Sequence, residues 1–239
     1  MLEKKKKQTG KKESKAARQG HDIIVIGASA GGVEALVDLA GQFPPDLPAS
    51  VFIVLHVAPY PPSTLPDILS KAGPLPASHA IHGEPIERGH IYVAPSDSHM
   101  TLQEGSLRVV RGPKENGHRP AVDPLFRTAA RRYRSRVIGV VLSGALDCGT
   151  AGLMVIKSFG GLAVVQDPKD ALYSDMPRSA IDHVKVDHVV PISGMGALLA
   201  RLAGEEAREN GAEGAPKMNR RRENEEGKEN NKISSITCP

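Results

Sequence analysis

DIIVIGASAGGVEAL, residues 22–36, decides the fold of this chain. Its apolar run predicts a buried strand, its small residues predict a tight turn, and its second half predicts a helix. The turn carries GASAG at residues 27–31, the G-x-S-x-G spacing that holds a serine on a sharp strand-to-helix bend at the carboxyl edge of a sheet. Unpaired N–H groups at the start of the helix can stabilise negative charge that develops on a substrate oxygen. Ser29 is therefore a candidate nucleophile.

A nucleotide site is the alternative for this glycine-rich turn, because similar turns after the first strand of α/β proteins bind phosphate. Two observations count against it. The spacing is not G-x-G-x-x-G, and the next predicted strand, residues 51–57, ends near His56 rather than in an Asp or Glu that would bind a ribose. Because the carboxyl ends of neighbouring parallel strands border one crevice, we expect Ser29 and His56 to face each other as nucleophile and base.

The order of the predicted elements indicates an α/β fold with three layers. Apolar runs typical of buried parallel strands alternate with helical patterns, which predicts a mostly parallel sheet with helices on both faces. The later strands are expected at residues 137–143, 162–165 and 188–192. Residues 90–94 and 100–110 are also strand-like, with a turn at Glu104-Gly105, so we expect an inserted β-hairpin.

Charge divides the 239 residues into a body and two tails. Residues 1–20 hold eight Lys and Arg against two acids, and residues 204–239 hold seven against eight, so we expect both tails to be disordered. The body, residues 21–203, holds sixteen basic and seventeen acidic side chains, although the whole chain has a net charge of +4. A body with no excess of basic charge, in a chain with 3% aromatic residues and no Trp, argues against nucleic-acid binding.

The remaining composition favours a cytoplasmic protein without a metal or other cofactor. The two cysteines, at positions 148 and 238, lie far apart in the sequence and predict no disulfide, as expected in a reducing compartment. No apolar run reaches the roughly 18 residues of a membrane span, and the basic N-terminus is not followed by the apolar stretch of a secretory signal. Four histidines cluster without a familiar metal-ligand spacing: His79, His82, His90 and His99.

Six motifs mark the body in order: GASAGG at 27–32, LHVAP at 55–59, IYVAPSDSHM at 91–100, HRPAVDPLFRTAA at 118–130, LSGALDCGTAGL at 142–153 and DMPRSAI at 175–181. Together they closely resemble the catalytic domain of chemotaxis protein-glutamate methylesterases, the CheB family, over about residues 21–203. The resemblance implies a three-layer α/β fold with a parallel sheet. It also implies hydrolysis of γ-glutamyl methyl esters on chemoreceptors to glutamate and methanol, with deamidation of receptor glutamines as a second activity.

The resemblance also implies roles for individual residues. By position, Ser29 is the nucleophile and His56 the general base. The family pattern Leu-Ser/Thr-Gly-x-x-x-Asp-Gly places the acid of a catalytic triad on Cys148, while Asp147 falls one residue early, so Asp147 is the candidate acid only if the turn shifts. Further candidates for oxyanion and substrate contacts are Ala30, Ala145 and Arg119. For His118, beside Arg119 in a polar loop, contact with an anionic substrate and plain solvation remain alternatives.

Two functional hypotheses follow. The first is an active methylesterase that binds methylated cytoplasmic segments of chemoreceptors. It would be associated with the membrane only by binding these membrane-bound receptors. The second is a catalytically weakened homologue that acts as a receptor- or partner-binding module, because the acid position holds Cys148. Well-known family members carry an N-terminal receiver domain. Here the matching region starts near residue 21, so we expect control by such a domain to be missing. A separate receiver protein remains an open alternative.

Overall fold

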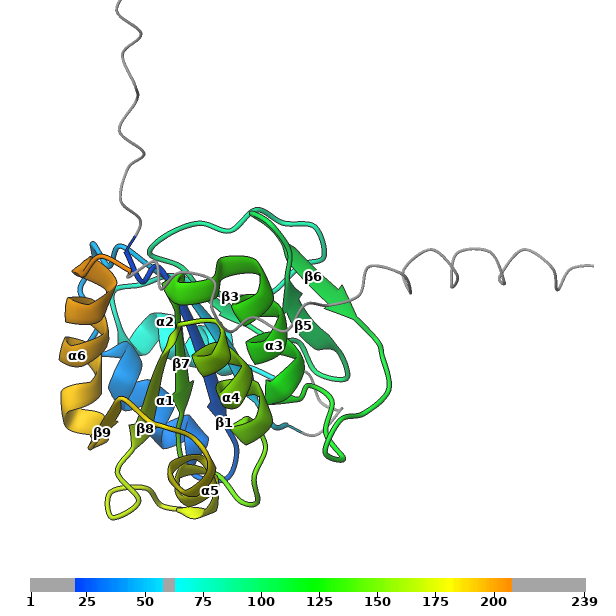
Figure 1. Cartoon of the computed structure of the whole chain (residues 1–239). Helices are drawn as coiled ribbons and strands as arrows, with labels where there is room; N and C mark the ends of the chain where they lie inside the picture. The colour runs from blue at the N-terminus through cyan, green and yellow to red at the C-terminus, as the bar shows by residue number, and fades with distance from the viewer. Residues whose placement is uncertain (1–19, 58–62, 208–239) are drawn as a thin grey trace, which may run out of the picture.

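The computed structural model describes residues 20–57 and 63–207. Within these residues a seven-stranded sheet has the strand order β3-β4-β2-β1-β7-β8-β9 (Figure 1), and its strands are β1 (Ile23–Ala28), β2 (Ser50–Leu55), β3 (Ala77–His79), β4 (Ile91–Val93), β7 (Val137–Val141), β8 (Leu162–Gln166) and β9 (His188–Val190). Every neighbouring pair in this sheet is parallel. A separate antiparallel hairpin contains β5 (His99–Leu102) and β6 (Leu107–Val110).

Helices cover both faces of the parallel sheet and bury its apolar side chains. One layer packs α1 (Gly32–Ala40), α2 (Leu65–Ala72) and α6 (Ile192–Gly204) against side chains such as Ile24 and Ile26. The opposite layer contains α3 (Val122–Tyr133), α4 (Thr150–Ser158) and α5 (Asp175–His183), which pack against Val25 and Phe52. A short 3-10 turn, Arg134–Arg136, leads from α3 into β7. Alternate residues of one strand thus belong to two different cores, as expected for a strand buried on both faces.

The three-layer α/β prediction is confirmed, and so is the inserted hairpin with its turn at Glu104-Gly105. Two details differ from the prediction. The strand-like residues 90–94 supply β4 to the main sheet rather than to the hairpin, and β3 was not predicted. Beyond the expected boundary at residue 203, α6 continues to Gly204 and Glu206 pairs with Gly20 across an antiparallel bridge. The tails expected to be disordered lie outside the described residues, except for Gly20 and residues 204–207.

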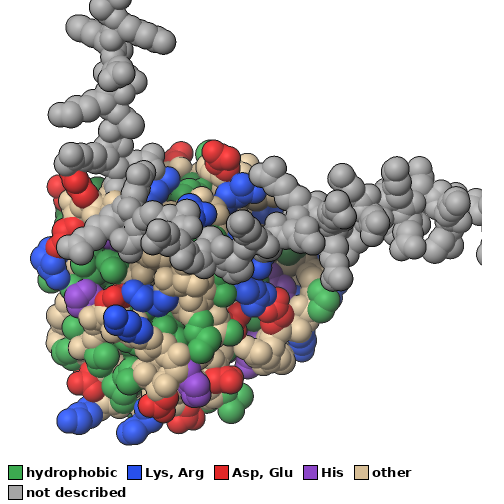
Figure 2. Space-filling model, viewed as in Figure 1, with side chains coloured by type: hydrophobic (Ala, Val, Ile, Leu, Met, Phe, Trp, Pro, Cys, Tyr) green, Lys and Arg blue, Asp and Glu red, His purple; other side chains and the backbone are tan. Residues whose placement is uncertain are grey.

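Two surface properties bear on the expectations from composition. None of the helices in residues 20–57 and 63–207 is long and apolar enough to cross a membrane. On the face drawn in Figure 2, the Lys and Arg side chains are interspersed with Asp and Glu rather than gathered into one basic patch. That mixture agrees with the nearly balanced charge of the body and shows no electrostatic footprint for nucleic acid on this face.

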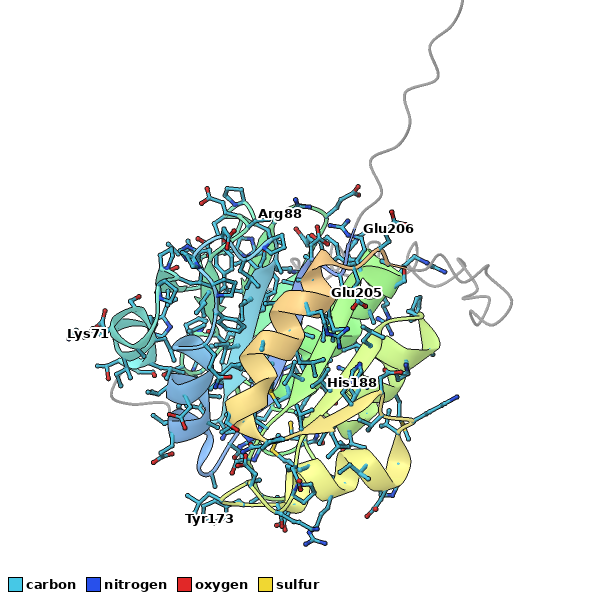
Figure 3. All side chains as sticks on the ribbon, turned by 90° about the vertical axis from the view of Figure 1, so that its left-hand side faces the viewer. Lys71, Arg88, Tyr173, His188, Glu205 and Glu206 are labelled. Carbon is cyan, nitrogen blue, oxygen red and sulfur yellow. The ribbon has the colours of Figure 1, made fainter. Side chains whose placement is uncertain are left out.

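A buried carboxylate anchors the amino end of β1. Asp22 is 4% exposed, and its oxygens accept hydrogen bonds of 2.8 Å from both Arg88, in the loop before β4, and Arg136, just before β7. In Figure 3, Arg88 is labelled at one end of the molecule and Tyr173 at the opposite end, where the strands finish. The Asp22 cluster therefore joins the segments that precede β1, β4 and β7, at the end of the sheet opposite the carboxyl ends of its strands.

Replacing this carboxylate tests how much the cluster stabilises the fold. We expect Asp22→Asn to lower the free energy of unfolding by about 1–3 kcal/mol, since hydrogen bonds to two charged guanidinium groups weaken together. Urea unfolding measures the change. Glu205→Gln is the matched control, because the Arg201–Glu205 pair is exposed and such pairs contribute about 0–1 kcal/mol. Equal losses in the two variants would contradict a special contribution from Asp22.

Candidate active site

The Ser29 turn forms at the carboxyl end of the central strand β1. Ala28 is the last residue of the strand, and α1 begins at Gly32. The backbone N–H of Gly32 donates to the carbonyl of Ser29 at 2.9 Å, and the N–H of Ser29 donates to the carbonyl of Ser143 at 3.0 Å. Since Ser143 follows β7, the turn is held by its own helix and by the neighbouring strand.

Two glycines make this turn possible. Gly31 has φ +68°, in the left-handed region, and a Cβ there would lie 2.8 Å from both Leu172 Cβ and Ser143 Oγ. Gly144 lies against the nucleophile itself, since a Cβ on Gly144 would lie 2.9 Å from Ser29 Cβ and would also strike Met176. Gly31, the second glycine of the G-x-S-x-G pattern, is therefore required by close packing as well as by backbone conformation.

His56 follows β2 and lies beside Ser29, which follows the neighbouring strand β1. Its backbone N–H donates to the Ala28 carbonyl at 3.1 Å, and its Nδ1 lies 3.2 Å from Ser29 Oγ. The serine hydroxyl donates to Nδ1 when the neutral ring carries its proton on Nε2. Burial and, to a lesser extent, the nearby His118 together lower the pKa of His56 from 6.5 to about 4. The ring is therefore neutral near pH 7, the state in which it can accept the serine proton.

The other side of the His56 ring lacks the partner that a triad acid supplies. Nε2 of His56 is buried and has no hydrogen-bond partner among the described residues. The imidazole of His118 instead stacks on the ring of His56, with centroids 3.7 Å apart and planes 7° apart. His118 belongs to the polar loop before α3, so the structure brings it to the site.

Cys148, which the family pattern aligns with the triad acid, faces the carboxylate of Asp123. Its side chain is buried, and its Sγ donates to Oδ2 of Asp123 at 3.8 Å. Burial raises the pKa of the Cys148 thiol and the nearby Asp123 raises it further, so the thiol is protonated at neutral pH. A protonated thiol is a weak donor, whereas the Nε2–H of His56 needs an acceptor.

Asp147 lies on the surface of the same loop. Its side chain is exposed, and its carboxylate makes no hydrogen bond or ion pair with another residue of the described ranges. Its backbone carbonyl accepts from the N–H of Thr150 at 3.1 Å, which turns the chain into α4. The structure therefore brings Ser29 and His56 together but leaves Asp147 apart from them.

The three candidates for substrate contact differ in their availability. The N–H groups of Ala30 and Ala145 make no hydrogen bond within the described part of the chain, so both can donate to a substrate oxygen. Arg119 is already engaged, because it donates to Asp97 and, at 2.7 Å, to the carbonyl of Gly112. The Arg119 hydrogen bond lowers the pKa of Asp97, which fits a structural ion pair in this loop.

Sequence reasoning missed two buried residues that shape the site. Asp123 is 2% exposed and accepts hydrogen bonds from the N–H groups of Gly149 and Gly152 at the start of α4, at 3.2 and 2.6 Å. Ser143 Oγ donates to the Ala30 carbonyl at 2.8 Å and accepts from the N–H of Tyr173 at 2.9 Å. Asp123 and Ser143 lie in motifs that were quoted from the sequence, but neither motif indicates which distant backbone groups they contact.

Nothing in the described residues indicates a metal centre. No group of three His, Cys, Asp or Glu side chains in residues 20–57 and 63–207 could hold a metal ion. His79 and His99, two of the clustered histidines, instead face backbone carbonyls at 2.8 Å through their Nε2 atoms. The chemistry available where Ser29 meets His56 is that of a hydroxyl group beside a neutral imidazole.

Comparison with known families matches residues 24–199 to the family described as CheB methylesterase. Over 181 residues the chain is 38% identical to protein-glutamate methylesterase/protein-glutamine glutaminase 2 of Anaeromyxobacter dehalogenans, which covers 76% of this chain and 53% of the relative. Over 186 residues it is 36% identical to the protein-glutamate methylesterase/protein-glutamine glutaminase of Ralstonia nicotianae, with 76% and 49% covered. The chain thus spans about half the length of these two relatives.

A solved structure has the same fold. The crystal structure of the Thermotoga maritima CheB methylesterase catalytic domain matches with a TM-score of 0.73 and 32% sequence identity. The match covers 76% of this chain and 98% of that one. The α/β architecture predicted from the order of elements is therefore shared with a methylesterase domain.

The low pKa of His56 predicts a pH dependence of stability. The ring titrates at 6.5 when unfolded but at about 4 when folded, so the unfolded chain binds more protons between these pH values. The stabilisation is complete above about pH 6.5 and is lost as the pH falls through 4, by at most about 3 kcal/mol. Partial exposure of the ring reduces this figure.

We expect the free energy of unfolding of His56→Gln to fall less than that of the wild-type protein between pH 7 and pH 4.5. Because the carboxylates are common to both proteins, their titration cancels in the difference. Urea unfolding at the two pH values gives the comparison. Parallel losses in the two proteins would contradict the depressed pKa of His56.

Proposed function

This chain belongs to the CheB methylesterase family, and we propose that it hydrolyses methyl esters of glutamate side chains on chemoreceptors, with glutamine deamidation as a second activity. The observation that carries the proposal is the 3.2 Å approach of Ser29 Oγ to His56 Nδ1 at the ends of adjacent parallel strands. The names of the relatives, protein-glutamate methylesterase/protein-glutamine glutaminase, support both activities.

The reaction proceeds through an acyl-enzyme. Ser29 Oγ attacks the ester carbonyl while its proton passes to Nδ1 of His56, and the carbonyl oxygen becomes negatively charged. The N–H groups of Ala30 and Ala145 donate to that oxygen. Collapse of the intermediate breaks the bond to the methoxy group, which leaves as methanol with the proton from His56. Water, activated by the same ring, then hydrolyses the ester on Ser29.

His56 works in this scheme without a carboxylate partner. When its ring takes the serine proton, the imidazolium carries Nε2–H into a buried position with no described acceptor. The burial that keeps the base neutral therefore also opposes its protonation during attack. Ser29 and His56 act as a dyad whose turnover is slower than that of a complete triad.

The alternative role as a binding module is not favoured. The matching family and the relatives are named as methylesterases. The proposed nucleophile, Ser29, also lies within hydrogen-bond distance of the proposed base, His56. Cys148 weakens the machinery without removing either reacting group. Methylated cytoplasmic segments of chemoreceptors are the proposed partners, a cytoplasmic location the proposed setting, and a separate receiver protein the proposed regulator.

Loss of either reacting group tests the mechanism. We expect Ser29→Ala or His56→Ala to lower methanol release from methylated receptor to background, with the double variant no worse, since the two groups act as a unit. Gas chromatography of released methanol is the measurement. Asp22→Asn is the control, because Asp22 lies at the amino end of β1, opposite the end that carries Ser29. Wild-type release by Ser29→Ala would show the mechanism to be wrong.

Restoring an acid tests the role of position 148. We expect Cys148→Asp to raise kcat by about one to three orders of magnitude, within the roughly 10⁴-fold that the acid contributes in a serine protease. Asp123 Oδ2 lies 3.8 Å from the present sulfur, so repulsion between two carboxylates should make the gain larger at higher pH. Cys148→Ser, which adds no charge, is the matched control.

Asp147→Asn separates the remaining possibilities. Little change in kcat is expected, because the carboxylate is exposed and contacts no described side chain. A large loss in Asp147→Asn, combined with no gain in Cys148→Asp, would mean that Asp147 serves as the acid after the loop rearranges.

A further inference from the structure

The stack between His118 and His56 has no role in the dyad described above. Centroids 3.7 Å apart and planes 7° apart place one imidazole flat on the other, so His118 touches the general base over its whole face. His118 comes from the loop before α3, whereas His56 follows β2. The contact therefore joins two segments about sixty residues apart in the chain.

The loop that carries His118 is fixed on both sides of that residue. The N–H of His118 donates to the Glu115 carbonyl at 2.9 Å, and the N–H of Glu115 donates back at 3.1 Å. Arg119, the next residue, donates to Asp97 and to the Gly112 carbonyl. The Glu115 carboxylate in turn accepts from Arg127 of α3 at 2.8 Å. His118 is thus held in place by its surroundings rather than by the stack alone.

His56 needs such a contact because, within the described residues, its ring has a hydrogen-bond partner at one nitrogen alone. A triad acid would hold the ring through Nε2, and that atom has no partner in the part of the chain that the structure describes. The approach of Nδ1 to Ser29 Oγ does not by itself prevent rotation of the imidazole about its bond to Cβ, because the χ2 torsion is broad. A parallel ring at van der Waals distance restricts that rotation.

We propose that His118 is a positioning residue that holds the imidazole plane of His56, with Nδ1 toward Ser29, in place of the missing triad carboxylate. The inference deepens the proposed function and rests on the assignment of His56 as the base. His118 makes this contribution by stacking, so another flat ring of similar size serves in its place.

The charge of His118 provides a second, separable effect. It is the second cause, after burial, of the depressed pKa of His56. Several other titratable or charged groups belong to the elements around the loop: Asp97, Arg111, Lys114, Glu115, Arg119, Asp123 and Arg127. Asp97 pairs with Arg111 and Arg119, and Glu115 pairs with Arg127. A neutral ring at position 118 therefore raises the pKa of His56, although burial keeps it below 6.5.

Two substitutions separate the stack from the charge. His118→Phe keeps a flat ring and removes the charge, whereas His118→Leu removes both. His188→Leu is the control, because His188, labelled in Figure 3, lies on the edge strand β9. The rate at which a fluorophosphonate probe labels Ser29 between pH 4 and pH 9 reports the reactivity of the dyad without a receptor substrate. NMR titration of His56 gives its pKa in each variant.

We expect His118→Leu to slow labelling of Ser29 at pH 8 about tenfold, as expected from the loss of one aromatic contact. The melting temperature should fall by no more than a few degrees, so the variant remains folded. His118→Phe should label within about twofold of the wild-type rate, with the acid limb of its pH profile moved to higher pH. His188→Leu should match the wild type in both measurements.

Two results would overturn the positioning role of His118: a wild-type labelling rate in His118→Leu, or an equal slowing in His118→Leu and His118→Phe. An unchanged pKa of His56 in His118→Phe would contradict the separate charge effect. If His118→Leu does not fold, the labelling rate of His118→Phe decides: a rate within about twofold of the wild type supports the proposal, and a tenfold slowing overturns it. Failure of the wild-type protein to release methanol from methylated receptor would contradict the proposed function, while the labelling rates would still test His118.

Discussion

The hydrogen bond from the N–H of Ser29 to the carbonyl of Ser143 is the contact on which the site depends. It lies where the strand order changes direction, since β1 has β2 on one side and β7 on the other. Ligand sites in open α/β sheets lie at such a point because the connections leave the two neighbouring strands in opposite directions and open a crevice. Here the three loops after β1, β2 and β7 carry Ser29, His56 and Ser143.

Burial of His56 has two opposed consequences for chemistry. Desolvation keeps the ring neutral at physiological pH, so the proposed base can accept a proton. The same desolvation makes the imidazolium less stable, and no described group accepts its second proton. A complete triad resolves the conflict with a carboxylate. In the proposed mechanism the His56 ring stays neutral at physiological pH. It lacks the carboxylate that would favour transfer of the Ser29 proton to the ring.

The parts predictable from sequence were those with a local cause. An apolar run followed by a glycine-rich turn predicts the Ser29 bend, and alternation of strands and helices predicts which loops share an edge. The strand β3 was missed because Ala77–His79 is three residues long and pairs with β4 without a hydrophobic pattern. The stack of His118 on His56 and the contacts of Asp123 depend on how distant loops meet, so no spacing in the chain encodes them.

Position 148 illustrates how stability and catalysis can compete at one residue. Asp123 places a carboxylate at the N-terminus of α4, where it accepts from the N–H groups of Gly149 and Gly152 and from Asn116. A carboxylate there also interacts favourably with the helix dipole.

A protonated thiol at position 148 is compatible with that carboxylate, because it donates a weak hydrogen bond and carries no charge. A second carboxylate would repel the first in a buried setting, although it is the group that His56 lacks. Cys148 is therefore compatible with Asp123 at the start of α4 but gives the proposed base, His56, no carboxylate. This is the direction of a trade-off between stability and activity.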